Sequence, residues 1–267
     1  MKTIKIIAAL FSLMTLFSAC QDVIDIDLDS IEPKLIIDGA LTDVNDTFVV
    51  RLSKSVDYFD TGIYPSVSGA VITITDNKGN AAQLDEAAPG VYSFNWPGIE
   101  GNEYALKVSV GGEEYTASVE MPFKVEMDSI SYEPTPDYME FSGGYLVSCH
   151  LSDPAGTENY YRLKVWNIRE QTEQDNVLYV YDDAFVNGNQ ITMRWDDQQF
   201  FLNDTIVVEL QTLAESTYDY YRTLASLFEG GMIGNANPAN PITNLSGDVL
   251  GYFGAYTVSR DTIIISE

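Results

Sequence analysis

The sequence predicts a mainly β protein: an N-terminal immunoglobulin-like β-sandwich followed by a second β-rich domain with one packed helix. Short runs of alternating apolar and polar residues recur from residue 33 to residue 213, and turn-forming residues separate them. The chain also contains 17 tyrosines and 12 phenylalanines, which favour pleated faces. The word immunoglobulin describes the architecture only, because the Cys…Trp…Cys pattern of that family is absent.

Residues 33–122 are predicted to form the first sandwich. The expected strands are 34–41, 47–53, 70–75, 91–95, 103–110 and 113–120. Tyr104, Leu106 and Val108 alternate with polar residues, so one face of that strand is expected to be buried. Gly111 and Gly112 stand between two such runs and predict a two-residue hairpin turn.

Residues 123–267 are predicted to form the second domain. The expected strands are 125–132, 145–151, 160–168, 177–181, 190–195, 205–213 and 261–266. The period changes to that of a helix near 216–229, with Ser216 as its cap and the glycines 230–231 as its end. A long loop, 231–248, follows. The glycines at 251 and 254 suggest bulges or close backbone contacts around an aromatic pair.

Cys20 follows a pattern that predicts a signal peptide over residues 1–19. Lys2 and Lys5 precede an apolar run, Ile6–Phe17, which is too short to span a bilayer. Small residues then lead to Cys20, and this arrangement resembles the lipobox of bacterial lipoproteins. Acyl chains on Cys20 would hold the chain on a membrane, at ~0.8 kcal/mol per buried CH2. The alternative is an ordinary secretory signal cleaved near Ala19.

Residues 20–32 are predicted to form an acidic tether. Its four aspartates are Asp22, Asp25, Asp27 and Asp29. An acidic stretch after a lipidated cysteine resembles the surface-export signal of Bacteroidota lipoproteins. Chance acidity is the competing interpretation, since the whole chain is acidic.

The charge of the chain limits its possible partners, and its cysteine content limits how the fold can be stabilised. The net charge of −26 at pH 7 argues against nucleic acid and anionic lipid headgroups as partners. After Cys20 only Cys149 remains, so an intramolecular disulfide is excluded and a packed core must stabilise the fold.

The residues for catalysis or metal binding are mostly missing, so the chain is not expected to be an enzyme. His150 is the only histidine, and its neighbour Cys149 points to the opposite, apolar face of the expected strand. Zinc sites need several histidines or cysteines. No cofactor or metal is expected; calcium in the loop 43–46 remains an alternative. A glycan-active hydrolase is the least favoured class.

Four tripeptides follow the pattern Asp-(Ser/Thr)-apolar, which resembles an O-glycosylation signal of Bacteroidota exported proteins. The acceptors would be Ser30, Ser129, Thr205 and Thr262. The competing interpretation is that Asp-Ser or Asp-Thr before a β-branched residue simply begins a strand.

Several segments together resemble a family of Bacteroidota outer-membrane lipoproteins known as a domain of unknown function (DUF 4249). The matching segments, in order, are Cys20 with 23–27, 33–39, 52–53 with 57–59, 67–70, 88–92, 237–238 with 243–244, and 251–256. The resemblance implies a two-part, β-rich surface lipoprotein. It also implies an accessory role beside a TonB-dependent transporter, and it carries no catalytic residues.

The expected function is therefore that of a lipid-anchored outer-membrane protein facing the cell exterior. It would assist a TonB-dependent uptake system by capturing a glycan or peptide ligand or by binding the transporter. The alternative is a structural or adhesin-like envelope protein. The long loop and the segment after it predict the contact residues Asn237, Asn240, Tyr252 and Phe253, although the two aromatics could instead fill the core.

Overall fold

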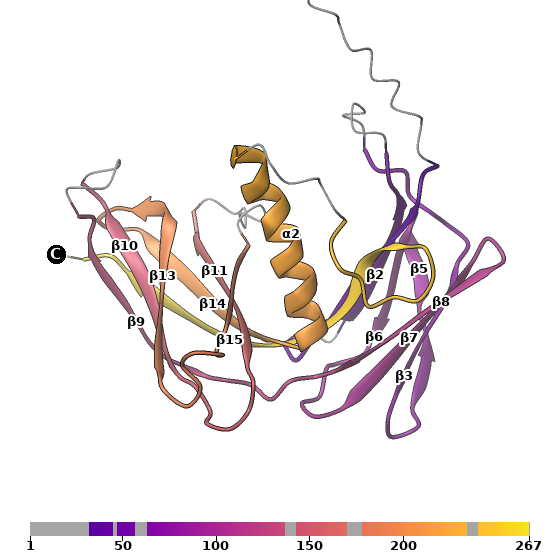
Figure 1. Cartoon of the computed structure of the whole chain (residues 1–267), viewed down its shortest axis with the longest axis horizontal. Coiled ribbons are helices and arrows are strands. Elements are labelled where there is room, and N and C mark those ends of the chain that lie inside the picture. The colour runs from indigo at the N-terminus through magenta and orange to yellow at the C-terminus, as the bar shows by residue number, and fades with distance from the viewer. Residues whose placement is uncertain are drawn as a thin grey trace, which may run out of the picture. The chain divides into compact units, whose positions relative to one another are not determined.

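The computed structural model describes residues 32–44, 47–56, 63–136, 143–169, 178–233 and 240–266, with the backbone alone for 228–233. Residues Pro33–Glu267 form one compact unit. Its described elements are strands and one helix (Figure 1). The fold is mainly β with several packed sheets, which confirms the predicted fold class. The predicted division at residue 122 stays a prediction.

In the described ranges, the strands follow one another along the chain and one helix lies near the end. They are β1 (Leu35–Thr42), β2 (Thr47–Lys54), β3 (Val71–Asp76), β4 (Ala81–Gln83), β5 (Asp85–Ala88), β6 (Val91–Asn95), β7 (Glu103–Val110), β8 (Glu113–Glu120), β9 (Met127–Pro134), β10 (Tyr145–Ser152), β11 (Tyr160–Asn167), β12 (Tyr179–Asp182), β13 (Gln190–Phe200), β14 (Thr205–Leu213), α2 (Glu215–Ile233) and β15 (Leu250–Ile264). The sequence patterns predicted most of these strands to within two residues. They missed β4 and β5, which are short and largely exposed.

Three sheets build the unit. An eight-stranded sheet has the order β12-β11-β14-β15-β1-β2-β6-β5, a four-stranded sheet has the order β4-β3-β7-β8, and a three-stranded sheet has the order β13-β10-β9. The alternation of buried and exposed residues in β7 turns one of its faces inward, as the sequence predicted. The expected hairpin is also present: Gly111 and Gly112 have φ values of 64° and 90°, and Val110 pairs with Glu113.

Two large clusters of buried side chains lie along the eight-stranded sheet, and a third, smaller cluster lies where α2 packs on it. The first contains residues of β1, β2, β3, β7 and β15, among them Ile37, Phe48, Ile72, Leu106 and Phe253. The second contains residues of β10, β11, β13 and β14, among them Val147, Cys149, Leu163, Trp195 and Val208. The part of the unit around the first cluster and the part around the second are here called its two halves. Because strands of the eight-stranded sheet contribute to both clusters, the two halves share one continuous sheet.

Strand β15 connects the two halves, and its length corrects the sequence prediction. The final strand was expected only over 261–266, whereas β15 covers Leu250–Ile264. It pairs in parallel with β1, with Gly39 opposite Phe253, and antiparallel with β14. The glycines that interrupted the pattern belong to this strand. Gly251 has a φ of 94°, and a Cβ there would lie 1.9 Å from the carbonyl oxygen of Ile37, so the close contact with β1 requires glycine.

Helix α2 begins at Glu215 and ends at Ile233, which is longer than the predicted 216–229. Ser216 therefore lies inside the first turn instead of preceding it, and the glycines at 230 and 231 do not end the helix. The helix packs on β15, β11 and β12. Tyr218 and Tyr221 are buried against this surface, so this side of the helix is a packing surface. No helix among the described residues is long and apolar enough to cross a membrane.

Candidate functional site

Several predicted site residues lie outside the described part of the chain. These are the lipidation residue Cys20, the export aspartates Asp22, Asp25, Asp27 and Asp29, the acceptor Ser30, and the contact residue Asn237. The roles assigned to them stay predictions.

The three other glycosylation acceptors all lie in strands. Ser129 is exposed in β9, Thr262 is exposed in β15, and Thr205 is half-buried as the first residue of β14. In each of the two later tripeptides the aspartate binds the backbone: Asp204 accepts from the N–H of Phe201, and Asp261 accepts from the N–H of Thr262. The position of Thr205 matches the competing interpretation, in which the tripeptide begins a strand. The modification itself remains a prediction.

Tyr252 and Phe253 are interior residues, which corrects their assignment as contact residues. Phe253 has no exposed surface and packs edge-to-face on Phe48, with ring centroids 5.9 Å apart. Tyr252 is 6% exposed, and its hydroxyl lies 2.6 Å from that of Tyr221. A partner outside the molecule cannot touch these rings, because the core around Phe48 encloses Phe253 and helix α2 covers Tyr252. Asn240, by contrast, is exposed as predicted.

The described end of the predicted loop forms one wall of a cleft. Asn244 fixes this segment to β15, because its side chain accepts from the N–H of Phe253 at 3.0 Å and donates to the carbonyl of Phe253 at 2.7 Å. Ser246 bonds to Thr116 of β8 through both backbone and side chain. The space between the segment and the outer face of β3, β7 and β8, here called the loop cleft, measures about 650 Å³.

Hydroxyl residues and apolar residues together line the loop cleft. Its lining includes Thr73, Thr75, Lys107, Thr116, Thr243 and Ser246. Hydroxyls both donate and accept hydrogen bonds, so this wall can bind a polar, uncharged ligand. Clefts of this volume are within the range of small-molecule sites.

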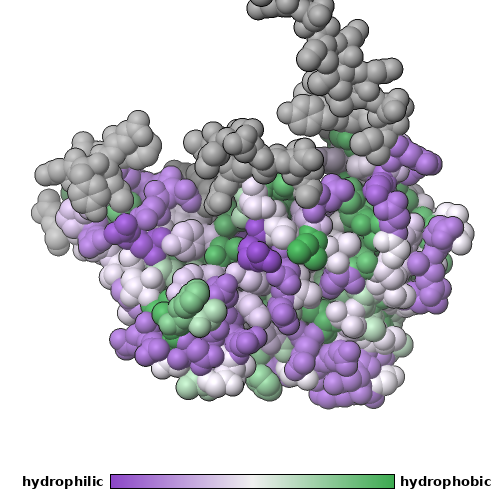
Figure 2. Space-filling model, viewed as in Figure 1, coloured by the Kyte–Doolittle hydropathy of each residue, from purple (hydrophilic) through white to green (hydrophobic). Residues whose placement is uncertain are grey.

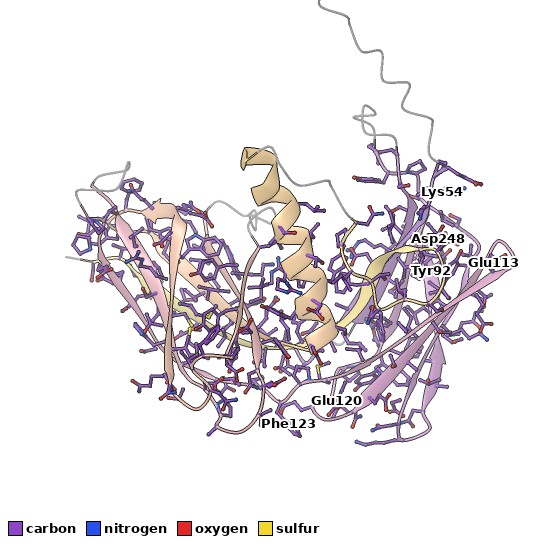
Figure 3. All side chains as sticks on the ribbon, in the orientation of Figure 1. Lys54, Tyr92, Glu113, Glu120, Phe123 and Asp248 are labelled. Atoms are coloured by element: carbon purple, nitrogen blue, oxygen red, sulfur yellow. The ribbon has the colours of Figure 1, made fainter. Side chains whose placement is uncertain are left out.

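A second cleft lies where the end of the β7–β8 hairpin meets the start of α2. This space, here called the junction cleft, measures about 620 Å³. Its lining includes Glu103, Glu120, Phe123, Glu158, Tyr160 and Glu215. Figure 3 labels Glu120 and Phe123, which come from β8 and from the connection after it. The face drawn in Figure 2 is mostly hydrophilic, with apolar side chains scattered over it.

The negative charge around the junction cleft affects the pKa of Tyr160. Burial, followed by the nearby carboxylates of Glu215 and Glu158, raises the pKa of the Tyr160 hydroxyl to about 12. Its ring also stacks on Tyr218, with the centroids 4.8 Å apart. The negative surroundings therefore stabilise the neutral phenol, and they favour a positive charge nearby.

The sequence prediction missed the junction cleft because its walls come from four separate segments. One signal was present. Glu103 and Glu120 stand at equal distances from the turn at Gly111 and Gly112, and the structure pairs them directly across β7 and β8. A hairpin drawn from the sequence would have placed the two carboxylates side by side.

His150 makes contacts that resemble part of a nucleophile–base pair. Its Nε2 lies 2.7 Å from Ser131 Oγ, and its Nδ1 lies 2.9 Å from Thr192 Oγ1. A hydroxyl takes the place where a carboxylate orients the base in serine hydrolases. His150 also lies in the central strand of the three-stranded sheet, where backbone N–H groups bond to neighbouring strands. The cluster is therefore best explained as a ladder of polar side chains.

Cys149 is a core residue, as the sequence predicted. It has no exposed surface. Burial, with a smaller contribution from Asp128, raises the pKa of its thiol to about 12. A thiol held neutral in this way is a poor nucleophile.

The loop suggested for calcium lies partly outside the described residues. Of its described members, Asp43 uses its carboxylate to accept from the N–H of Val258 at 2.9 Å and to pair with Lys124 at 2.7 Å. These contacts join the chain after β1 to β15 and to the connection after β8. In the ranges that the structure describes, no three histidine, cysteine or acidic side chains are grouped closely enough to hold a metal ion.

Comparison with protein-family models identifies the family. A model named "Domain of unknown function (DUF4249)" matches residues 21–262, so the chain belongs to this family. A search of curated proteins found no match.

A comparison with solved structures also returned matches. A two-domain fibronectin type-III segment of chicken tenascin is 16% identical, covers 67% of this chain and 90% of its own, and has a TM-score of 0.22. The chicken CNTN1 FN1–FN3 domains are 10% identical, cover 68% of this chain and 62% of their own, and have a TM-score of 0.26. The chicken interferon gamma receptor alpha chain is 8% identical, covers 69% of this chain and 91% of its own, and has a TM-score of 0.23.

Proposed function

We propose that this DUF4249 protein is a non-enzymatic, lipid-anchored protein of the outer membrane. In this proposal it faces the cell exterior and serves a TonB-dependent uptake system by capturing a ligand or by binding the transporter. The observation that carries the anchoring is the short apolar run before Cys20, with lysines in front of it and small residues after it.

The loop cleft supports a role in capture. Its wall is held in place by Asn244 and Ser246, so the hydroxyl groups of Thr73, Thr75 and Thr116 are preorganised on a rigid sheet. Loops fixed on a rigid scaffold commonly carry binding. A glycan or a polar peptide segment fits the hydrogen-bonding capacity of this lining.

Anchoring is tested by replacing Cys20. The Cys20→Ala variant should lose incorporation of labelled palmitate and should be released from the membrane fraction. A second variant, with Asp22, Asp25, Asp27 and Asp29 changed to alanine, should keep the lipid but lose protease accessibility on whole cells. Normal lipid incorporation in Cys20→Ala would refute the anchor.

Partner binding is tested by copurification from membranes of the native bacterium. The wild-type chain should bring down an outer-membrane transporter, identified by mass spectrometry. Thr75→Arg places a long side chain in the loop cleft, and it should reduce this recovery if the cleft is part of the contact. Thr47→Arg, on the exposed end of β2, serves as the matched control. Absence of any transporter from the wild-type sample would refute the accessory role.

A structural or adhesin-like role is the second candidate, and the continuous eight-stranded sheet favours it. A shared sheet makes the two halves a stiff spacer, because bending between them would break the pairing of β1 with β15. In that role the protein would copurify with no transporter, and cells lacking it would show altered adhesion or envelope integrity with normal uptake.

A further inference from the structure

Two aspartates of the second half are buried without a basic partner. Asp153 directly follows β10 and is 6% exposed, and Asp183 directly follows β12 and is 2% exposed. Within the described residues, neither carboxylate forms an ion pair. Burying a carboxylate costs free energy unless a cation or hydrogen bonds replace the lost water. The two charges therefore need compensation from other groups.

Hydrogen bonds supply part of this compensation, but they add no positive charge. Asp153 accepts from the hydroxyl of Tyr161 and, at 2.8 Å, from the N–H of Gly188. Asp183 accepts from the N–H of Asn159 at 3.0 Å. Burial raises the pKa of Asp183, the bond from Asn159 lowers it, and the carboxylate of Asp153 raises it. The two negative charges are therefore close enough to repel one another.

The strand pairing directs the groups around these charges into the same interior. Asn159 and Asp183 continue the ladder of β11 with β12 as opposite residues, since the N–H of Asp183 donates to the carbonyl of Asn159 at 3.2 Å. Opposite residues of a ladder share a face of the sheet. Tyr161, two residues after Asn159, shares this face and reaches Asp153 with its hydroxyl. This face packs on the three-stranded sheet, because Tyr161 belongs to the second cluster.

A buried oxygen on this face is the second, independent indication of a missing cation. Asn159 is 9% exposed, and its Oδ1 is buried and has no hydrogen-bond partner. A buried carbonyl oxygen without a partner costs free energy. An amide beside carboxylates satisfies itself by turning its NH2 group toward them. An oxygen in that place instead adds a third acceptor to the two carboxylates, and a cation would satisfy all three.

The chemistry of the three groups favours calcium. Calcium binds hard oxygen ligands and takes further ones from carbonyl groups and water, whereas zinc prefers histidine and cysteine. In the described ranges no three acidic, histidine or cysteine side chains are grouped closely enough to hold a metal ion, so the third side-chain ligand is a neutral amide. With only two carboxylates, the affinity should lie in roughly the 10⁻⁴–10⁻³ M range of extracellular calcium modules.

The two loops that contain the aspartates are already tied together. Residues 153–159 join β10 to β11, and residues 183–189 join β12 to β13. The N–H of Gly156 donates to Oδ1 of Asn187 at 2.8 Å, and Nδ2 of Asn187 donates to the carbonyl of Thr157 at 2.8 Å. These bonds hold the loops in place before an ion binds, which reduces the loss of conformational entropy on binding.

We propose that Asp153, Asp183 and Asn159 bind a calcium ion between the loop after β10 and the loop after β12. The ion neutralises the two buried carboxylates and gives the amide oxygen a partner. Oxygen atoms of water or of backbone carbonyls complete its coordination. This site differs from the loop 43–46 considered from the sequence, where the described aspartate already pairs with a lysine. It goes beyond the proposed capture role, because it requires neither the lipid anchor nor a transporter.

The test is calorimetric titration of calcium chloride into the full chain, purified in detergent and freed of metal with a chelator. The wild-type chain should bind calcium with saturation, and its thermal midpoint should rise when calcium is added. Asp183→Asn should weaken binding at least tenfold. Asp85→Asn is the matched control, because it removes one exposed aspartate of β5 and should leave the affinity within twofold.

Two changes at Asn159 test its oxygen as a ligand and guard against a folding defect in Asp183→Asn. Asn159→Asp keeps an oxygen ligand and removes the NH2 group, so it should retain calcium binding or strengthen it. Asn159→Leu removes the oxygen and should weaken binding at least fivefold. An equal loss in both variants would overturn the proposal, because a structural role of the amide would then explain the effect.

Three further outcomes would also overturn the proposal. The first is the absence of saturable calcium binding by the wild-type chain. The second is unchanged affinity in folded Asp183→Asn and Asn159→Leu, or an equal loss in Asp85→Asn, because binding would then reflect only the net charge. The third is equal affinity for magnesium, which demands a smaller and more regular site. No membrane or transporter takes part, so failure here leaves the anchoring and accessory role to their own tests.

Discussion

Replacing Gly251 by alanine tests whether the contact between β15 and β1 holds the fold together. Gly251 has a φ of 94°, and a Cβ at this position would lie 1.9 Å from the carbonyl oxygen of Ile37 and 2.7 Å from its carbonyl carbon. Backbone atoms of a paired strand cannot rotate away as the end of a long side chain can. The strands must therefore separate locally at the one parallel pairing recorded in the eight-stranded sheet.

The cost of Gly251→Ala can be divided into two contributions. Positive φ in a residue with a Cβ costs roughly 1–2 kcal/mol. Forcing an extra methyl group into a packed site costs a further ~1–3 kcal/mol. The free energy of unfolding should therefore fall by about 2–5 kcal/mol.

Gly79→Ala is the matched control, because it has the strained backbone without the clash. Gly79 has a φ of 87°, and a Cβ there would meet no atom within 4 Å. This variant should lose only roughly 1–2 kcal/mol. The assay is urea unfolding followed by far-ultraviolet circular dichroism and tryptophan fluorescence, with unchanged denaturant slope as the condition for comparing midpoints. Equal losses in the two variants would refute the close contact between β15 and β1.

Three further predictions concern the interior. Phe253→Ala should lower the free energy of unfolding by ~3–5 kcal/mol, whereas Phe185→Ala, at a ring that is 97% exposed, should change it by less than ~0.5 kcal/mol; similar losses in urea would argue against the buried position of Phe253. The thiol of Cys149, whose pKa burial raises to about 12, should resist N-ethylmaleimide at pH 7.5 in the folded protein and react in urea, as peptide mass spectrometry would measure. Burial raises the pKa of the Tyr218 and Tyr220 hydroxyls to about 12. The stability that these neutral hydroxyls contribute is therefore complete below the unfolded pKa of about 10 and is lost as the pH rises to about 12. Tyr220→Phe should make the decline of the urea midpoint over this pH range shallower, and an unchanged decline would show that Tyr220 does not contribute to it.

The local features of this protein could be predicted from its sequence because they depend on neighbouring residues. Alternation placed Tyr104, Leu106 and Val108 on the buried face of β7, and it placed Cys149 in the core. Two adjacent glycines predicted the β7–β8 turn, since both positions need positive φ. A change to a helical period predicted α2 over 216–229. The helix begins one residue earlier than predicted, at Glu215, and ends four residues later, at Ile233.

Part of the candidate site could be predicted in the same way. The loop after α2 was expected to contribute to binding, and its described residues Thr243 and Ser246 do line a cleft. The aromatic residues that follow were assigned to the same role, and this was wrong for Tyr252 and Phe253. A run of glycines and aromatic rings does not reveal whether the strand will have free faces or be covered on both sides.

Only the tertiary structure decided which strands pair and which carboxylates meet. Gly251 and Gly254 obscured the strand pattern of β15. The advantage of glycine at 251 depends on the approach of β1, more than 200 residues away, and at 254 it depends on the nearness of Tyr252 and of Thr217 in α2. The acids of the junction cleft come from the hairpin, from the segment just before β11 and from the start of α2. The sequence determined the alternation, turns and charge of each segment, since these are local. The shared sheet and the acidic cleft depend on contacts between distant segments, which only the folded chain brings together.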